Sequence, residues 1–361
     1  MSESNAIANG LAGAGGGIIA QILTYPLQAV NTRQQTERTL KKNKQSLLPQ
    51  SSNTTTTDSS SSPGFFVQIF QVIGNEGWGG LYSGLKPSLL GTAASQNKAV
   101  AIAAARKLKG HGDGTVGMFG WLVVAAIAGS LNVLFTNPIW VLVTRMQTHN
   151  QAERKIMEEK KELLRKAASE SMLAGSTLED RLEELNSTKP KPFGTIHAAN
   201  EVYNEAGIVG FWKGVIPALI MVCNPSIQFM IYESSLKRLR AKRSAKKQGN
   251  TSITALEVFI VGAIAKLGAT VTTYPLLVVK SRLQAKQEIG GSNSLRYSGT
   301  FDAILKMIRY EGLPGFYKGM STKIVQSVFA ASVLFMVKEE LVKAIMILAN
   351  KSKNVVLNLS S

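Results

Sequence analysis

The sequence predicts an all-α membrane protein in which six transmembrane helices form three repeated hairpins around a pseudo-threefold axis. The first observation is a repeated pattern, in which an arginine follows a proline by seven residues and a glutamine follows it by nine. This pattern occupies residues 26–35, 138–147 and 275–284. The second observation is that each copy follows a long segment with few or no charges. Three copies of one unit are expected to pack together and bury a common interior.

The composition narrows the class of protein. The 361 residues carry a net charge of +18, which suggests a polyanionic partner such as nucleic acid, anionic lipid or a phosphorylated metabolite. A hydrophobic content of 45% and the long uncharged segments argue against nucleic-acid binding. The single cysteine, Cys223, excludes an internal disulfide framework and a multi-cysteine metal site, and we interpret it as a small apolar helix residue.

Five segments have the length and polarity expected of membrane spans, since a helix needs roughly 20 residues to cross the hydrocarbon core. Residues 4–32 and 114–144 contain no charge, and residues 214–232 add 19 uncharged positions. Residues 258–279 are uncharged except for Lys266, and residues 324–337 run into a charged cluster at 338–340.

The remaining span, the second in chain order, is short. Only residues 87–97 are uncharged between Lys86 and Lys98, and such a helix covers about 16 Å, roughly half a bilayer. A crossing here has to include Lys98 and continue through residues 99–105. This is the weakest of the six predicted spans.

These spans define three repeats at residues 5–105, 114–240 and 252–348. The first repeat carries an insert at about 45–63 whose Ser/Thr-rich run is predicted to be disordered, followed by a short amphipathic helix at 65–73. The second repeat carries a charged insert at about 150–190, either a solvated surface helix or a partner-binding helix. The basic run at 238–247 is a flank of the fourth span, a lipid-headgroup site or a contact for an import receptor.

The repeated pattern itself predicts a gate. Each proline removes one backbone hydrogen bond and is expected to kink its helix, and these prolines are Pro26, Pro138 and Pro275. Pseudosymmetry would then bring the following arginines and glutamines together as a polar ring that closes the path and attracts anions, unless the arginines only reach the interface. The ring residues are Arg33, Gln35, Arg145, Gln147, Arg282 and Gln284.

Lys266 stands where the other repeats have Gly17 and Gly129, nine residues before the proline. A charge at this depth costs roughly 2.5–3.5 kcal/mol, so it is expected to face water, a partner or a bound anion. Lys266 is thus either a substrate-phosphate or coupling residue, or a lysine paired within the protein.

A second glycine motif ends each linker, and its two glycines are seven residues apart at 77 and 84, 207 and 214, and 312 and 319. Backbone amides there hold a lipid phosphate or cap a helix. The three histidines are scattered, no catalytic triad, paired-carboxylate or metal-binding pattern stands out, and we predict neither an enzyme nor a metal site.

The three repeats closely resemble the mitochondrial carrier family, solute carrier family 25. Its motif P-x-[DE]-x-x-[KR]-x-[KR]-x-Q is followed by [DE]-G-x4-[WYF]-[KR]-G, and the likeness covers the chain outside the inserts. The resemblance implies six tilted helices, three surface helices, a central substrate site and alternating access.

The departures from the family motif are informative. Its acidic position is occupied by Gln28, Trp140 and Leu277, and the basic position after it by Asn31, Val143 and Lys280. The usual ring of three salt bridges is therefore absent, and only Lys280 remains as a charged gate residue.

A non-ionic gate of this kind is similar to that of the peroxisomal branch of the family. This implies a multi-pass protein of the peroxisomal membrane, rather than of the mitochondrial inner membrane or plastid envelope. The implied activity is exchange of NAD for AMP, ADP or related adenine nucleotides, with a CoA, FAD or ATP carrier as the alternative. NAD and the nucleotides are cargo, and no resident cofactor is implied.

The family also implies where cargo binds, midway along the even-numbered helices. Counting from the last glycine of each linker places candidate contacts at Gly91 or Thr92, Met221 or Val222, and Gln326. Asn224, Ser226 and Gln228 are candidates for hydrogen bonds to ribose or base, and ordinary helix packing is the alternative for each.

The second helix departs most from the family, which has an aromatic-rich second half there. In this chain Gln96 is followed at once by Asn97 and Lys98, as though about ten residues were lost. The alternative hypothesis is therefore a splice or gene-model variant of a carrier that is impaired in transport.

Overall fold

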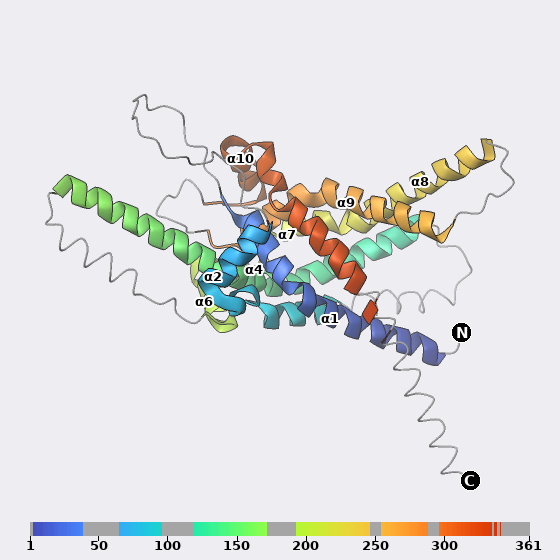
Figure 1. The fold of residues 1–361 in the computed structure, drawn as a ribbon, viewed down its shortest axis with the longest axis horizontal. Coiled ribbons are helices and arrows are strands. Elements are labelled where there is room, and N and C mark those ends of the chain that lie inside the picture. The colour runs from blue at the N-terminus through green and yellow to red at the C-terminus, as the bar shows by residue number, and fades with distance from the viewer. Residues whose placement is uncertain are drawn as a thin grey trace, which may run out of the picture.

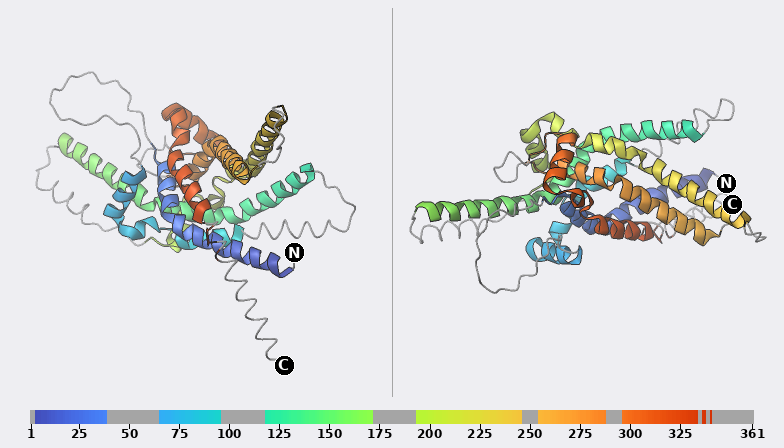
Figure 2. Two further views of the ribbon diagram at one scale, coloured as in Figure 1. Left: turned by 45° about the vertical axis from the view of Figure 1, so that its right-hand side comes forward. Right: turned by 90° about the horizontal axis from the view of Figure 1, so that it is seen from above.

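The computed structural model describes residues 3–38, 65–95, 118–171, 193–245, 254–287, 296–333, 336–337 and 340. Within these ranges every regular element is helical and no strand occurs. The helices approach one another near the middle of the view and diverge toward the right, while the end of α4 extends to the left (Figure 1). The two further views in Figure 2 show the same divergence.

Three long helices carry the repeated pattern. They are α1 (Glu3–Thr36), α4 (Met118–Ser171) and α9 (Ala255–Gln284), and each continues past its internal proline. All three pack against one another in pairs. Pro26, Pro138 and Pro275 therefore lie within continuous helices, and the kinks stay a prediction.

The even-numbered spans are described in part. The second is helical over residues 85–95 and the sixth over 320–333. The fourth consists of α7 (Val215–Ile220), η2 (Met221–Cys223) and α8 (Asn224–Ala245). Pro225 has no N–H to donate to the carbonyl of Met221, which accounts for the 3₁₀ turn at this point.

Among the described helices, three are long and apolar enough to cross a membrane: Ala126–Arg165, Ile208–Arg243 and Leu256–Gln284. They fall on the predicted third, fourth and fifth spans. The predicted truncation of the second helix after Gln96 lies outside the described residues, as does the Ser/Thr-rich run at 51–62.

Short helices cover the end where the long helices meet. They are α2 (Phe65–Leu81), α6 (Thr195–Ala206) and α10 (Thr300–Tyr310), and α6 and α10 are followed by the 3₁₀ turns η1 (Ile208–Trp212) and η4 (Leu313–Tyr317). The predicted amphipathic helix at 65–73 is thus the first part of α2. All six glycines of the linker motif have positive φ, between 61° and 84°.

The charged insert of the second repeat begins as a continuation of α4. The helix runs without interruption to Ser171 and projects away from the bundle (Figure 1). This agrees with a surface helix as far as residue 171, and the rest of the insert, to 190, lies outside the described residues.

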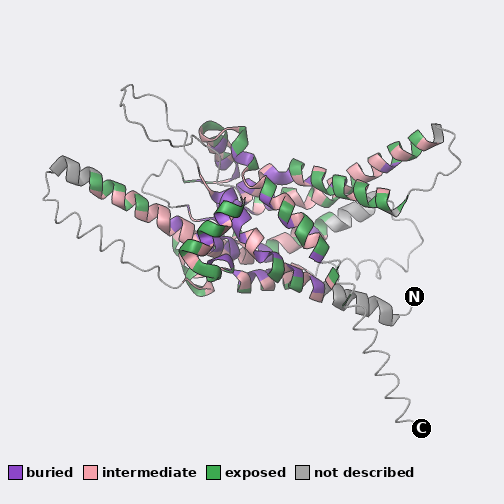
Figure 3. Ribbon diagram, in the orientation of Figure 1, coloured by how far each residue is buried: buried purple, intermediate pink, exposed green. Residues whose placement is uncertain are grey.

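The buried side chains concentrate where the helices converge, and exposed residues follow the diverging arms (Figure 3). Tyr274, Val278 and Met307 form part of the apolar core there. Along the arms, large apolar side chains such as Phe135 and Phe259 are exposed, as expected of surfaces that face lipid.

Candidate functional site

The three arginines of the repeated pattern join the repeats in a closed cycle. Each Nε donates to the main-chain carbonyl of a glutamine in another repeat: Arg33 to Gln147 at 2.9 Å, Arg145 to Gln284 at 3.0 Å, and Arg282 to Gln35 at 2.9 Å. All six residues are buried. The predicted convergence around a pseudo-threefold axis is therefore confirmed.

The remaining guanidinium nitrogens bind carboxylates of the short surface helices and the turns after them. Arg33 forms two bonds with Glu76, at 2.9 and 2.8 Å, Arg145 lies 2.5 Å from Glu205, and Arg282 binds Glu311. The arginines thus anchor these segments, and their charges are neutralised within the protein. In this conformation they are not exposed to attract an anion.

The carboxylates of these pairs stay ionised although they lie in protected surroundings. Burial opposes ionisation of Glu311, but hydrogen bonds and charge from Arg282 hold its pKa below the usual value of 4.5. Arg33 likewise lowers the pKa of Glu76. Arg145 and Lys213 together lower the pKa of Glu205.

The glutamine side chains connect neighbouring repeats. Gln35 accepts a hydrogen bond from Ser281 at 2.7 Å and donates to Tyr274 at 3.3 Å. Gln284 accepts from Thr144 at 3.2 Å and donates to Asn137 at 3.3 Å. Sequence reasoning missed these partners, because only the helix crossing brings them to the glutamines.

The positions that depart from the family motif also bind neutral partners. Gln28 accepts from Gln21 of the same helix at 2.7 Å, and only Asn31 reaches another repeat, where it donates to the carbonyl of Gly319 at 2.7 Å. Neutral hydrogen bonds therefore replace ion pairs in this part of the gate.

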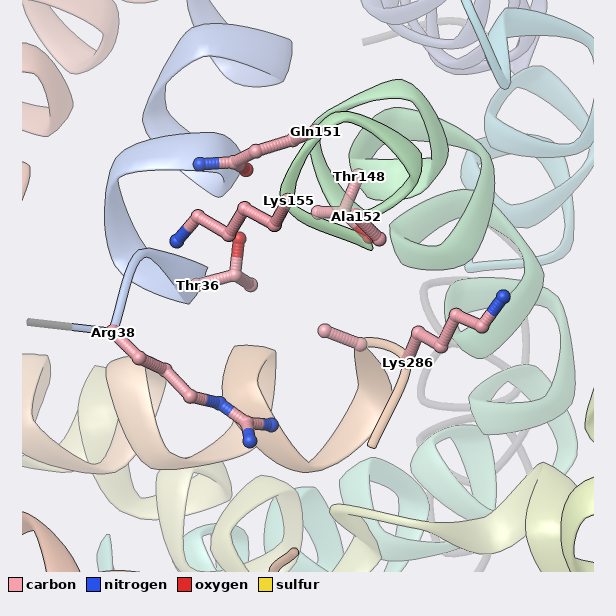
Figure 4. A pocket seen from close by; sticks show the side chains of 8 residues that line it. Thr36, Arg38, Thr148, Gln151, Ala152, Lys155 and Lys286 are labelled. Atoms are coloured by element: carbon pink, nitrogen blue, oxygen red, sulfur yellow. The ribbon is translucent and has the colours of Figure 1, made fainter. Parts of the chain in front are cut away.

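The end of the bundle is closed. A pocket there is lined by Thr36, Arg38, Thr148, Gln151, Ala152, Lys155, Ala285 and Lys286, and its open space is about 10 Å³ (Figure 4). This is room for about one water molecule. Its residues come from the ends of α1 and α9 and from the middle of α4.

The lysines along α9 form a second feature. Lys266 and Lys280 are 14 residues apart, nearly four helical turns, so they lie on the same side of α9 about 21 Å from each other. Lys323, on the helix at 320–333, is close enough to repel both ammonium groups. We call Lys266, Lys323 and Lys280 the lysine stripe.

Two predicted cargo residues join the lysine stripe. Gln326 is buried and accepts a hydrogen bond from Lys323 at 3.1 Å. Asn224 donates to Thr273 at 2.6 Å, and Thr273 lies on α9 between Lys266 and Lys280. Lys323 itself was missed in the sequence, although it stands only three residues before Gln326.

The other predicted cargo residues are half-buried but make no side-chain hydrogen bond to this group in the part of the chain that is described. They are Thr92, Met221, Val222, Ser226 and Gln228. Neighbouring Gly91 packs closely against Ile139 and Trp140 of α4, which supports helix packing as its task.

A larger cavity of about 650 Å³ lies between the first and second repeats. Its lining includes Ser83, Gly84 and Lys86 at the start of the second span, and Gly194 and Thr195 at the start of α6. This is the place where the linker glycines predict a lipid phosphate, and that role stays a prediction.

Comparison with known proteins identifies the family. The profile of the mitochondrial carrier protein family matches residues 2–110, 180–243 and 251–347. The peroxisomal nicotinamide adenine dinucleotide carrier of Arabidopsis thaliana is 58% identical over 97% of this chain and 99% of its own. Mitochondrial substrate carrier family protein Q of Dictyostelium discoideum is 37% identical over 93% of this chain and 88% of its own. Peroxisomal membrane protein PMP34 of Mus musculus is 33% identical over 62% of each chain. With the repeated pattern, the closed arginine cycle and these relatives in agreement, the chain belongs to the mitochondrial carrier family and is a membrane transporter rather than an enzyme.

Proposed function

We propose that this carrier exchanges NAD for AMP, ADP or a related adenine nucleotide across the peroxisomal membrane by alternating access. The observation that carries the proposal is the lysine stripe, which sets three cations along one side of α9 beside Asn224 and Gln326. The similarity to the Arabidopsis peroxisomal carrier supports both the cargo and the membrane.

In this mechanism the stripe attracts the phosphates of the cargo. Asn224, Ser226, Gln228 and Gln326 supply hydrogen bonds to ribose or base, while Met221 and Val222 pack against the adenine ring. Thr92 approaches from the second helix. Release on the closed side requires the arginine–glutamine cycle to separate, because its hydrogen bonds join all three repeats there.

Counter-exchange in liposomes tests the proposal. Purified protein is reconstituted with internal AMP, and uptake of labelled NAD is compared with that of CoA, FAD and ATP. We expect saturable NAD uptake that depends on internal AMP or ADP. Uptake of CoA or FAD in preference to NAD would assign a different cargo to the same fold.

A second candidate is a carrier impaired in transport. The alignment with the Arabidopsis carrier is 360 positions long and includes 97% of the 361 residues of this chain, which is about 350 residues. At about ten positions of the alignment, this chain therefore has a gap. A loss of this size is the one that the sequence predicts after Gln96. If this chain is an impaired carrier, it should stay in the membrane pellet after carbonate extraction. It should then exchange NAD far more slowly than the Arabidopsis protein assayed beside it.

We also propose the basic run at 238–247 as the contact for a peroxisomal import receptor. Its described part forms the end of α8, where Lys242 is exposed and Arg243 is half-buried. Replacing the basic residues by glutamine should reduce peroxisomal targeting without changing exchange in liposomes.

A further inference from the structure

The residue before each proline of the repeated pattern is polar and buried. These residues are Tyr25, Asn137 and Tyr274, and each is at most 2% exposed. A buried hydroxyl or amide needs hydrogen-bond partners, because an unpaired polar group destabilises the fold. The partners of these three side chains therefore indicate what the position before the proline does.

Each of these side chains donates to the linker of its own repeat. The acceptor is the carbonyl of the residue immediately before the last linker glycine. The pairs are Tyr25 to Ser83 at 2.7 Å, Asn137 to Lys213 at 3.3 Å, and Tyr274 to Lys318 at 2.7 Å. The carbonyl of the glycine that follows accepts a hydrogen bond from the first turn of the even-numbered helix in each repeat. The position before the proline thus fixes the start of that helix against the odd-numbered helix of the same hairpin.

Two of the three side chains also accept from a gate glutamine of another repeat. Gln35 of the first repeat donates to Tyr274 of the third at 3.3 Å. Gln284 of the third repeat donates to Asn137 of the second at 3.3 Å. At these two junctions one side chain therefore joins the turn within a repeat to the contact between repeats.

The junction between the first and second repeats lacks this bond. Gln147 Nε2 is buried, and no acceptor in the described part of the chain meets it with hydrogen-bond geometry. Thr144 and Ser281 donate to the other two gate glutamines. Thr32, at the equivalent position, donates instead to a carbonyl of its own helix at 3.0 Å. This layer of the gate is therefore incomplete at one junction.

The residue types suit a double contact. A tyrosine hydroxyl and an asparagine amide each combine a donor with an acceptor, so one side chain can bind a linker carbonyl and a glutamine NH₂ group together. A phenylalanine at 274 would lose both bonds and keep the ring. The ring stacks on Tyr317, with centroids 6.2 Å apart, and Tyr317 is itself 40% exposed.

We propose that Tyr25, Asn137 and Tyr274 are positioning residues of the gate, which pass movement of the even-numbered helices to the contacts between repeats. The predicted cargo positions lie seven or eight residues beyond the last linker glycine, about two turns into those helices. Cargo that shifts such a helix would move its first turn and, through the residue before the proline, the gate glutamine. The cargo positions rest on the proposed function, whereas the hydrogen bonds can be tested without it.

The first experiment measures opening of the closed end in the absence of cargo. Gln151, which lines the pocket there (Figure 4), is replaced by cysteine in a Cys223→Ser background, and reaction of the purified full chain with a maleimide is followed. Tyr274→Phe should raise the reaction rate about two- to tenfold, because it removes a hydrogen bond that joins two repeats in the closed state. Tyr317→Phe is the matched control, since it removes an exposed hydroxyl from the same stacked pair, and should leave the rate unchanged. Equal rates in the two variants would overturn the proposal.

A double-mutant cycle distinguishes coupling from a general loss of structure. Gln35→Ala and Tyr274→Phe should have less than additive effects on the logarithm of the labelling rate, because both remove the same contact. Gln147→Ala and Tyr25→Phe should be closer to additive, since no hydrogen bond joins that pair. Additive effects of the Gln35 and Tyr274 changes would show that Tyr274 acts only on its own hairpin, which also overturns the proposal.

Exchange of NAD in liposomes is the second readout. Tyr274→Phe should lower the maximal exchange rate, because the closed end has to form again in every cycle, while Tyr317→Phe should exchange at the unmodified rate. A maximal rate unchanged by Tyr274→Phe would contradict a role in gating. If the unmodified chain exchanges no NAD, the proposed function fails, and the labelling rates still decide whether Tyr274 positions the gate.

Discussion

At the scale of single residues, the arginines of the repeated pattern act through pairing. Arg282 is fully buried, and Glu311 beside it is 6% exposed. Arg243 and Glu257, at the opposite end of the bundle, are 24% and 30% exposed. Arginine–glutamate ion pairs therefore occur in two environments, and solvent screens the Arg243–Glu257 pair but not the Arg282–Glu311 pair.

Replacing Arg282 by glutamine should destabilise the protein by about 3–5 kcal/mol, because Glu311 would remain buried without its cation. Arg243→Gln should have a much smaller effect, since that pair is partly hydrated. Thermal unfolding in detergent measures both. Adding Glu311→Gln to Arg282→Gln should recover part of the loss, and a double variant as unstable as the single one would contradict the argument.

The same pairs predict acid sensitivity. The pKa values of Glu76, Glu205 and Glu311 are lower in the folded protein than the usual 4.5. A lowered folded pKa stabilises the fold above the unfolded pKa, and this contribution is lost as pH falls through the folded value. The unfolding midpoint should therefore drop as pH falls below about 4.5, and the Arg282→Gln/Glu311→Gln variant should show a smaller drop.

At the scale of elements, the linker glycines turn the chain from the surface helices into the membrane helices. Gly207 has a φ of 61° and ends α6, while Gly214 has a φ of 75° and begins α7. Only the second of these lies against another helix, since a Cβ there would be 3.1 Å from the Lys280 carbonyl oxygen. At Gly207 nothing lies within 4 Å.

This contrast gives a matched pair of substitutions. Both Gly207→Ala and Gly214→Ala place a side chain at positive φ. Gly214 lies in the left-handed helical region, where the cost is roughly 1–2 kcal/mol, while Gly207 has a ψ of −155°, in a region almost restricted to glycine, where the cost is about 1–3 kcal/mol. Gly214→Ala should lose about 1–3 kcal/mol more, because α9 must shift to admit the methyl group. A loss at Gly214→Ala no larger than the backbone cost of about 2 kcal/mol would show that the approach of α7 to α9 does not limit this position.

At the scale of the whole molecule, contacts between repeats hold one end closed. Lys286, just after α9, pairs with Glu201 of α6 at 3.0 Å and with Glu153 of α4 at 3.3 Å. Arg154 of α4 lies 3.3 Å from Glu76 of α2. The part of α4 that begins the charged insert thus links all three repeats at the closed end.

Weakening these links should favour opening at this end. Lys286→Gln removes two partly exposed ion pairs of up to about 1 kcal/mol each, so the open state should rise by up to about fivefold for each pair lost. A thiol introduced by Gln151→Cys in a Cys223→Ser background should then react faster with a maleimide. Lys306→Gln, which breaks an ion pair within α10, serves as the control. Equal reaction rates in the two variants would contradict a role for Lys286 in closure.

Much of this architecture follows from the sequence alone. Charge-free stretches, together with the threefold spacing of proline, arginine and glutamine, determine three helical repeats that meet at one end, because a bilayer excludes charge and repeats bury their faces against their copies. The spacing of the linker glycines likewise predicts the turns, since positive φ is readily adopted only by residues without a Cβ.

The partners across the helices depended on the tertiary structure. The sequence placed the arginines in a gate, but only the packing of surface helices beneath the bundle brought Glu76, Glu205 and Glu311 to them and turned an exposed charge into a buried pair. The sequence also selected Lys266 and Lys280 as isolated lysines on one helix. Lys323 joined them because the helix of the sixth span packs near α9. This contact brings together residues more than 40 positions apart, and no local sequence pattern encodes it.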